Sequence, residues 1–360
     1  MNIRLNLSGL RRRRGDTPQA AEELRAAEIA RQIRELRESE ADLEAESLRE
    51  AEKRAAAASF AFEEPRSENG SSGAERSGVR LESEAPAIEL RGAACAYGSL
   101  QAVRPLDWTV RRGEFWAVLG PNGSGKTSLL GLVSGAERPS AGEVRIAGRP
   151  AAEYGRRERA RRLAVLPQEG LPPLSITVRD ALEMGRFPYR DRFGRDRDPS
   201  ARELLARIAE RLELTALLPR RLDELSGGQR QRAALGQVMA QQPEILLLDE
   251  PTAYLDVYYQ LDVMELVREW REEAGLTVVA VLHDLNLAAQ YAERLLLLRG
   301  GERAAEGTPE EVLTPELVGD LYGVAPPLIV RREEIGAPQL LFRADSQMRK
   351  VRPVRAERRT

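Results

Sequence analysis

Several residue types that define whole classes of protein are scarce or missing in this sequence. Among its 360 residues there is a single cysteine, so no intrachain disulfide can form and a reducing compartment is allowed. No apolar run approaches the ~20 residues that span a membrane, and the N-terminus has no apolar signal core. A formal net charge of −2 provides no global field that would favour nucleic acid. We therefore expect a soluble chain with no nucleic-acid partner, which is peripheral if it works at a membrane.

Lysine and histidine are so scarce that the few present stand out. Lys53, Lys126 and Lys350 are the only lysines among 55 basic residues, and His283 is the only histidine. The excess of arginine over lysine is compatible with genomic composition alone. The local setting of Lys126 and His283 therefore decides whether they carry chemistry.

The two ends of the chain differ in composition from its centre. Residues 17–64 are rich in alanine, glutamate and arginine and have few apolar positions, which is typical of a charged, solvated helix. A flexible linker follows at 67–78, so the helical extension and linker are expected to occupy 1–85. Residues 331–360 are interpreted as a C-terminal tail, whose last part is basic. The sequence leaves open whether the extension is a solvated appendage or a docking or regulatory helix, and whether the tail favours an anionic membrane surface.

The centre of the chain, residues 86–330, has the pattern of an α/β domain. Short apolar runs such as FWAVLG, EILLLDE and LTVVAVLH alternate with helix-like segments. Continuous apolar runs of this length are typical of strands buried on both faces, which predicts a largely parallel core sheet. Residues 170–240 hold mostly helical patterns between two such runs, and this predicts an inserted helical subdomain.

The most specific motif is GPNGSGKTS, which matches the pattern GxxxxGK[ST]. It follows the apolar run FWAVL and precedes LLGLVSG, so it lies between a predicted strand and a predicted helix, as a phosphate-binding loop requires. Its glycines let the backbone turn amides towards phosphate oxygens, and the helix N-terminus adds partial positive charge. Lys126 is expected to reach the β- and γ-phosphates, and the Thr127 hydroxyl to bind Mg²⁺. The predicted ATP-binding residues of this loop are Gly120, Pro121, Asn122, Gly123, Ser124, Gly125, Lys126, Thr127 and Ser128.

Two acidic residues end the apolar run ILLLDEP. A buried strand places its last residues at the carboxyl edge of the sheet, where α/β proteins bind their ligands. Asp249 is expected to hold Mg²⁺, directly or through water. Glu250 is the candidate general base for a water that attacks the γ-phosphate. Taken alone, the two acids would be typical of a solvated turn, and the phosphate loop in the same chain favours the catalytic interpretation.

A second anion site is predicted at the start of LSGGQRQRAALGQVMA. Helix-forming residues follow SGGQ at once, so the serine and the glycines lie at a helix N-terminus, where backbone amides bind anions. Because this segment belongs to the inserted subdomain, we expect it to serve the nucleotide of another copy of the chain. The residues of this motif are Leu225, Ser226, Gly227, Gly228 and Gln229.

These motifs, in this order, resemble those of the nucleotide-binding subunits of ABC transporters, from about residue 87 to 325. The resemblance implies that Tyr97 stacks on adenine and that Gln168, in LPQE, senses Mg²⁺ and the attacking water. LSGGQ resembles the family signature, which contacts the ATP of the partner, and Asp256, in AYLD, resembles the loop that couples the paired sites. Taken singly, Tyr97 would be a packed surface tyrosine and Gln168 an ordinary polar loop residue.

His283 follows an apolar run in VVAVLHDLN. By itself, a histidine in this position is more often a satisfied core imidazole. However, this run is predicted to be the neighbour of the strand that ends at Asp249, so His283 would emerge at the same carboxyl edge as the phosphate loop. It resembles the switch histidine of the family, and a neutral imidazole there can bridge a γ-phosphate oxygen and the attacking water. The catalytic candidates are therefore Glu250, His283 and Gln168.

The resemblance also implies a fold and a mechanism. The fold would be a RecA-like core with a mixed or parallel sheet, a small antiparallel β region and the helical subdomain. ATP would bind with Mg²⁺, which Thr127, Gln168 and Asp249 would ligate. Two such domains pair head to tail around ATP, and their closure drives membrane subunits. The implied partners are a second copy of the chain, polytopic permease subunits and, indirectly, a substrate-binding protein, at the cytoplasmic face of the cell membrane.

One stretch narrows the group within the family. SITVRDALEMGRFPYRDRF, residues 175–193, lies where the family touches its membrane partners and resembles the importer ATPases for iron–siderophores, haem and cobalamin. We therefore expect a subunit that powers import of a siderophore or haem, or of cobalamin, through separate membrane chains. The alternative is a soluble ABC ATPase that transports nothing, such as a cluster-assembly ATPase.

Overall fold

The computed structural model describes residues 85–253, 255–331 and 336–342. All of them belong to one unit of the chain, Ser67–Thr360. The predicted helical extension, the linker and the basic end of the tail lie outside the described residues.

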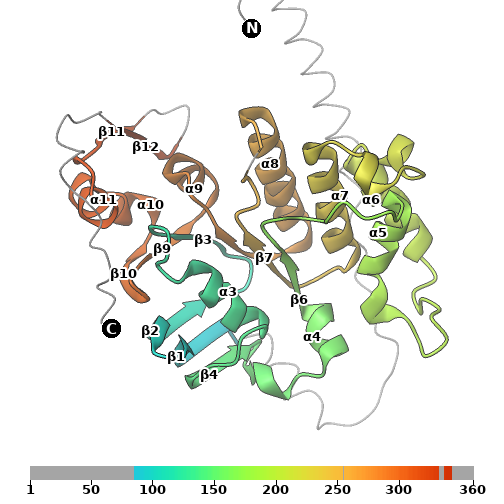
Figure 1. Ribbon diagram of the computed structural model, residues 1–360, viewed down its shortest axis with the longest axis horizontal. Coiled ribbons are helices and arrows are strands. Elements are labelled where there is room, and N and C mark those ends of the chain that lie inside the picture. Colours follow the sequence, from blue (N-terminus) through green and yellow to red (C-terminus); the bar gives the residue numbers. More distant parts are fainter. Residues whose placement is uncertain (1–84, 254, 332–335, 343–360) are drawn as a thin grey trace, which may run out of the picture. The chain divides into compact units, whose positions relative to one another are not determined.

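A six-stranded sheet forms the centre of the described unit (Figure 1). Its strands run in the order β10-β9-β3-β8-β7-β6, and every neighbouring pair is parallel except β9 with β10. The predicted core sheet is thus confirmed, with one antiparallel edge strand. The strands are β3 (Phe115–Leu119), β6 (Leu163–Leu166), β7 (Ile245–Asp249), β8 (Thr277–Val281), β9 (Arg294–Arg299) and β10 (Glu302–Gly307).

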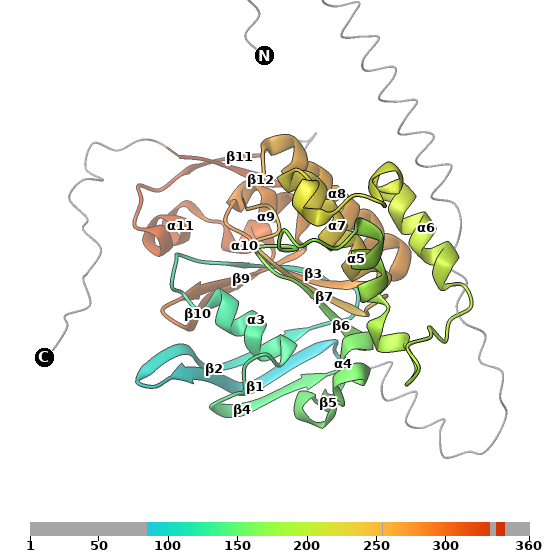
Figure 2. The ribbon, with the colours of Figure 1, turned by 45° about the vertical axis from the view of Figure 1, so that its right-hand side comes forward.

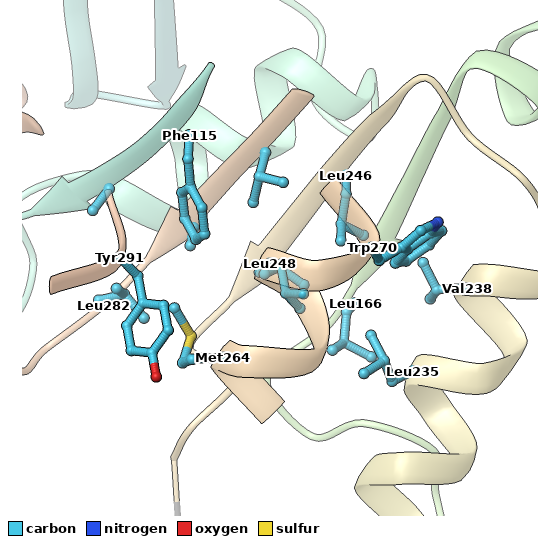
Figure 3. Close-up of a cluster of buried hydrophobic side chains, with 14 of the residues drawn as sticks. Phe115, Leu166, Leu235, Val238, Leu246, Leu248, Met264, Trp270, Leu282 and Tyr291 are labelled. Carbon is cyan, nitrogen blue, oxygen red and sulfur yellow. The ribbon is translucent and has the colours of Figure 1, made fainter. Parts of the chain in front are cut away.

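Successive side chains of this sheet enter two different hydrophobic cores. Because side chains alternate across a strand, Phe115 and Ala117 of β3 face one core whereas Trp116 and Val118 face the other. Helices α7 (Gly227–Ala240), α8 (Val257–Ala274) and α9 (Leu285–Tyr291) cover the first face, where their side chains meet those of β3, β6 and β7 (Figure 3). Burial on both faces explains why these strands are continuously apolar in sequence.

The second face of the sheet is covered by α3 (Lys126–Ser134) and a smaller antiparallel sheet (Figure 2). The smaller sheet has the order β2-β1-β4-β5. Trp108 of β2 packs edge-on against Trp116 of β3, with 5.4 Å between the ring centres, and so joins the two sheets. The strands are β1 (Ile88–Tyr97), β2 (Leu100–Val110), β4 (Ala141–Ile146) and β5 (Arg149–Pro150), and α4 (Arg156–Arg162) follows them.

The α-helices of the inserted region lie between β6 and β7. They are α5 (Val178–Gly185), α6 (Ala201–Arg211) and α7, within the span predicted as a helical subdomain. Thr177 caps α5 and Ser226 caps α7, each through a reciprocal pair of hydrogen bonds with the third helical residue. The short 3₁₀ turns of the described unit are Ala151–Glu153, Phe187–Tyr189, Thr215–Leu217 and Leu222–Glu224.

The C-terminal part adds α10 (Pro309–Val312), α11 (Pro315–Tyr322) and an antiparallel pair of strands, β11 (Leu328–Arg331) and β12 (Pro338–Leu341). β12 lies in the region predicted to be a tail, and it packs against α9. A four-residue strand gives too little periodicity to be found from sequence. Across the described residues, no helix is both long and apolar enough to span a bilayer.

Candidate functional site

The phosphate loop connects β3 to α3 and depends on glycine at two positions. Gly120 and Gly125 have φ angles of 151° and 100°, which L side chains rarely adopt. A Cβ on Gly120 would lie 2.2 Å from the carbonyl oxygen of Leu298, and one on Gly125 would lie 2.2 Å from that of Ala102. Glycine is therefore required at both positions, because neighbouring strands approach the backbone of the loop too closely for a side chain.

Lys126 is folded into this loop. Its side chain is buried, and Nζ donates hydrogen bonds to the carbonyl oxygens of Gly120 at 2.8 Å and Pro121 at 3.1 Å. Burial lowers the pKa of Lys126, and the nearby carboxylates of Glu250 and Asp249 oppose this effect. Among the described residues, no side chain caps α3 and no acid lies in its first turn. A cation and a free helix N-terminus therefore meet where a phosphate would bind.

Asp249, at the end of β7, lies beside the start of α3. The Thr127 hydroxyl hydrogen-bonds to its carboxylate, while burial and the charge of Glu250 raise the pKa of Asp249. Asp249 Oδ1 and Ser124 Oγ are buried without a hydrogen-bond partner among the described residues. An unpartnered carboxylate oxygen next to a hydroxyl is a donor set that suits Mg²⁺, so these residues fit the predicted ion.

Glu250 is held by two of the residues predicted to act with it. Gln168 Nε2 donates to Glu250 Oε2 at 2.6 Å, and His283 Nε2 lies 2.5 Å from Glu250 Oε1. The backbone of Glu250 is left-handed, with φ of 49°, which is unusual for a residue other than glycine and stores strain. The strand end thus aims one carboxylate at a glutamine and a histidine from two other segments.

His283 does not pack in the core. Its side chain is 48% exposed, whereas that of Glu250 is 16% exposed. His283 follows β8 and directly precedes Asp284, the residue that caps α9. The structure therefore places it at the carboxyl edge of the sheet, beside the residue that follows β7.

Tyr97 stands at the end of β1, close to the phosphate-loop helix. Tyr97 is 47% exposed, and its hydroxyl interacts with the side chain of Ser128. An exposed aromatic face beside the loop can stack on a nucleotide base.

The LSGGQ motif lies apart from this cluster. Leu225 is buried, and Ser226 and Gln229 satisfy each other's backbone amides at the start of α7. Helix α7 packs on the first core face and α3 on the second, so the two anion-binding motifs belong to opposite faces of the sheet. Asp256 lies near LSGGQ, because it caps α8 through the Tyr259 amide and the Tyr259 ring approaches Gly228.

Two buried polar residues that the sequence did not single out join segments that are distant along the chain. Gln231, two positions beyond the motif, donates to the carbonyl oxygen of Pro251 at 3.0 Å, just after Glu250. Arg186, only 1% exposed, forms ion pairs with Asp196 at 2.9 Å and Asp198 at 3.1 Å. A polar residue stands out as a structural contact only when it is known to be buried. A sequence does not show burial at single positions, so it could not identify these two residues.

Arg186 also binds the end of α7. It donates to the carbonyl oxygen of Ala240 at 3.0 Å and to Gln242 Oε1 at 2.6 Å, and it stacks over the ring of Tyr189. Two hydrogen bonds therefore hold the segment after α5 against the end of the helix that begins with LSGGQ, and three further contacts of Arg186 lie within that segment.

A phosphate loop, a buried aspartate and a strained glutamate at one sheet edge define a nucleoside-triphosphate-hydrolysing protein of the phosphate-loop class. A profile described as "ABC transporter" matches residues 103–253. FepC, a ferric enterobactin transport ATP-binding protein of Escherichia coli (strain K12), is 40% identical over 228 residues, or 63% of this chain and 84% of FepC.

Two further comparisons agree. HmuV, a hemin import ATP-binding protein of Rhodopseudomonas palustris (strain BisB5), is 39% identical over 263 residues, or 71% of this chain and 97% of HmuV. The ATP-binding cassette MJ0796, solved as a dimer with ADP and Pi, is 30% identical with a TM-score of 0.54, and the match covers 61% of this chain and 98% of that one. The chain belongs to the ATP-binding proteins of ABC transporters, and it is an ATPase. These relatives favour a transporter over a soluble cluster-assembly ATPase.

Proposed function

We propose that this chain hydrolyses ATP to power an importer of an iron chelate, a siderophore or haem. The observation that carries the activity is the contact of Glu250 with both Gln168 and His283 beside the phosphate loop. The cargo is supported by FepC and HmuV, which match this chain over 84% and 97% of their lengths.

The residues around the loop divide the work of hydrolysis. The amides of the loop and of the first turn of α3 would surround the phosphates, and Lys126 would leave its contacts with the loop carbonyls to reach the β- and γ-oxygens. Tyr97 would stack on the base. Thr127, Asp249 and Gln168 would hold Mg²⁺, which neutralises charge that develops on the phosphate oxygens. The buried, unpartnered Asp249 Oδ1 supports this assignment.

Glu250 is assigned the proton transfer. Its carboxylate would accept a proton from the attacking water as that water adds to the γ-phosphorus. His283 would contact the γ-phosphate and orient the water, and Gln168 would hold Glu250 from the other side. The left-handed backbone of Glu250 supports this role, because strain of this kind accumulates at functional sites.

A second copy of the chain would complete the site. The LSGGQ motif is exposed at Ser226 and Gly227 and packs on the opposite face from its own phosphate loop. In a head-to-tail pair, residues 225–229 of each copy would contact the γ-phosphate held by the other, and Asp256 would lie at the junction. ATP would then favour the closed pair, because only there do both anion sites meet one nucleotide.

The membrane partner would dock on the end of α5 and the segment that follows it. Met184, Phe187 and Phe193 expose 45%, 58% and 72% of their surface, an apolar patch that suits burial by a permease. Arg186 holds this segment on the end of α7, so movement of the patch would move the LSGGQ helix with it. The chain would then be peripheral at the cytoplasmic face of the membrane, and a substrate-binding protein would deliver the cargo to the permease.

Uptake in cells that lack this chain tests the proposal. We expect lost uptake of one labelled ferric siderophore or of haem, restored by the wild-type chain and not by Glu250→Gln. A polytopic membrane protein should co-purify with both forms. Normal uptake of every siderophore tested, of haem and of cobalamin would contradict an import role, even if ATPase activity were intact.

A further inference from the structure

The start of α9 is fastened to β12 by one side chain. Asn286 Oδ1 accepts a hydrogen bond from the Leu340 amide at 2.7 Å, and Asn286 Nδ2 donates to the Leu340 carbonyl oxygen at 3.3 Å. A primary amide offers a donor and an acceptor side by side, as a peptide group does. The Asn286 side chain therefore binds Leu340 as a neighbouring strand would, and it connects segments 54 positions apart.

The two hydrogen bonds between Asn286 and Leu340, which we call the clasp, lie close to the proposed catalytic contact. Asp284 caps α9 by accepting from the amides of Asn286 at 2.8 Å and Leu287 at 3.1 Å. His283 is the residue just before this cap, and its Nε2 lies 2.5 Å from Glu250 Oε1. The turn that carries His283 is held by β8 at its N-terminal end and by α9 at its C-terminal end. The position of His283 therefore depends on how firmly the start of α9 is held.

The β12 side of the clasp is firmly anchored. Leu340 is 2% exposed and belongs to the first core, together with the buried face of α9. β12 also pairs with β11, with Leu340 opposite Ile329. Asn286 therefore binds a strand that the core already holds, and the strand can act as a support for the helix start.

We propose that Asn286 is a positioning residue for His283. By binding both backbone polar groups of Leu340, it fixes the start of α9 and thus the turn from which His283 reaches Glu250. This inference rests on the proposed role of His283 in hydrolysis. A displacement of about 1 Å at a reacting group can cost about 10²-fold in rate, so a loosened turn should affect turnover more than ATP binding.

Steady-state hydrolysis by purified full-length variants provides the first test. Asn286→Ala loses both hydrogen bonds, and we expect kcat to fall about tenfold with an unchanged KM for ATP. Asn286→Asp keeps the acceptor for the Leu340 amide and should give an intermediate kcat. It also carries the test if the alanine variant does not fold. A wild-type kcat in a folded Asn286→Ala or Asn286→Asp variant would overturn the proposal.

A matched control separates positioning from stability. Val318, on α11, is fully buried in the same core, and its apolar side chain forms no hydrogen bond with Asn286 or Leu340. Val318→Ala should lower the Tm at least as much as Asn286→Ala does, yet keep the wild-type kcat at a temperature well below both Tm values. If Val318→Ala lowers kcat by the same factor, the effect of Asn286 is a stability effect and the proposal is wrong.

A double-variant cycle tests whether Asn286 acts through His283. In a His283→Ala background, Asn286→Ala should cause no further loss of single-turnover rate, because the side chain that it positions is gone. An equal loss in both backgrounds would overturn the inference and leave the proposed function intact. Wild-type turnover by His283→Ala alone would refute the role of His283, and it would refute this inference together with that part of the proposed function.

Discussion

The two anion-binding motifs of this chain are held in opposite ways. Around the phosphate loop, Asp249 and Ser124 keep buried oxygens without partners among the described residues, Lys126 binds the loop's own carbonyls, and Glu250 has a left-handed backbone. At the LSGGQ motif, Ser226 and Gln229 satisfy each other and the helix start is exposed. The first site holds unsatisfied and strained groups, which suit binding of Mg²⁺ and a nucleotide, whereas the second site satisfies its own polar groups.

This difference matches the division of labour that we propose. Groups that change charge or exchange protons need a site where water does not already satisfy them, because pKa values and electrostatic interactions shift most there. A surface that only recognises the nucleotide of another copy can stay solvated until the two copies meet. The following changes test this contrast, in order of decreasing expected effect.

Glu250→Gln should cause the largest loss. The amide keeps the size of the side chain but cannot accept the proton, so we expect kcat to fall by about 10²–10⁴-fold. ATP binding should persist, and a closed dimer should accumulate in size-exclusion chromatography with ATP. Wild-type turnover in this variant would refute the general-base assignment.

His283→Ala should fold and bind ATP but lose about 10²-fold or more in hydrolysis, as expected when a donor to developing phosphate charge is removed. Because the side chain is 48% exposed, the Tm should change little. Thermal unfolding and phosphate release measured on the same sample give both values. A variant that does not fold would instead indicate a structural role.

Lys126→Ala should weaken ATP binding about ten- to hundredfold, because a hydrogen bond to a charged group contributes about 1.5–3 kcal/mol. Fluorescent-nucleotide titration gives the Kd. Arg299→Ala is the matched control, since it removes an exposed cation of the ion pair with Asp320. Equal Kd values for the wild type and Lys126→Ala would contradict the loop assignment.

Ser226→Ala tests the satisfied motif. Loss of an N-cap should lower the free energy of unfolding by about 1 kcal/mol, and turnover should fall because the amides that face the partner's nucleotide become less ordered. Thr308→Ala removes the equivalent cap of α10 and should cost similar stability with normal turnover. If both variants hydrolyse ATP alike, the LSGGQ motif contributes only to folding.

Tyr322→Phe should have the smallest effect. The Tyr322 hydroxyl is buried and lies near the Gly120 backbone without a hydrogen bond of normal geometry among the described residues, so its removal should change the free energy of unfolding by no more than about 1 kcal/mol. Burial raises the pKa of Tyr322 from 10.0 to about 12. A raised pKa contributes stability that is present below pH 10 and lost as pH rises towards 12. Urea unfolding at pH 7 and pH 11 should therefore show a smaller loss for the variant.

The sequence predicted the parallel sheet and the position of each motif on it. It did so because buried strands leave continuous apolar runs, and because the phosphate loop and the two acids each occupy consecutive residues. The Arg186 cluster, the tie from Gln231 to Pro251 and strand β12 were not predicted. Each depends on a contact between distant segments, or on a strand too short to show a period.

The sequence alone determines the chemistry that the chain can perform. It also determines the edge of the sheet where that chemistry would occur. Whether His283 is a core residue or a partner of Glu250 could not be decided there, because an apolar run followed by histidine fits both. The answer required the order of the strands, which sets β8 next to β7, and the left-handed turn that aims Glu250 at the imidazole. The sequence motifs show which chemical groups the chain contains. Packing between distant segments decides which of these groups come into contact.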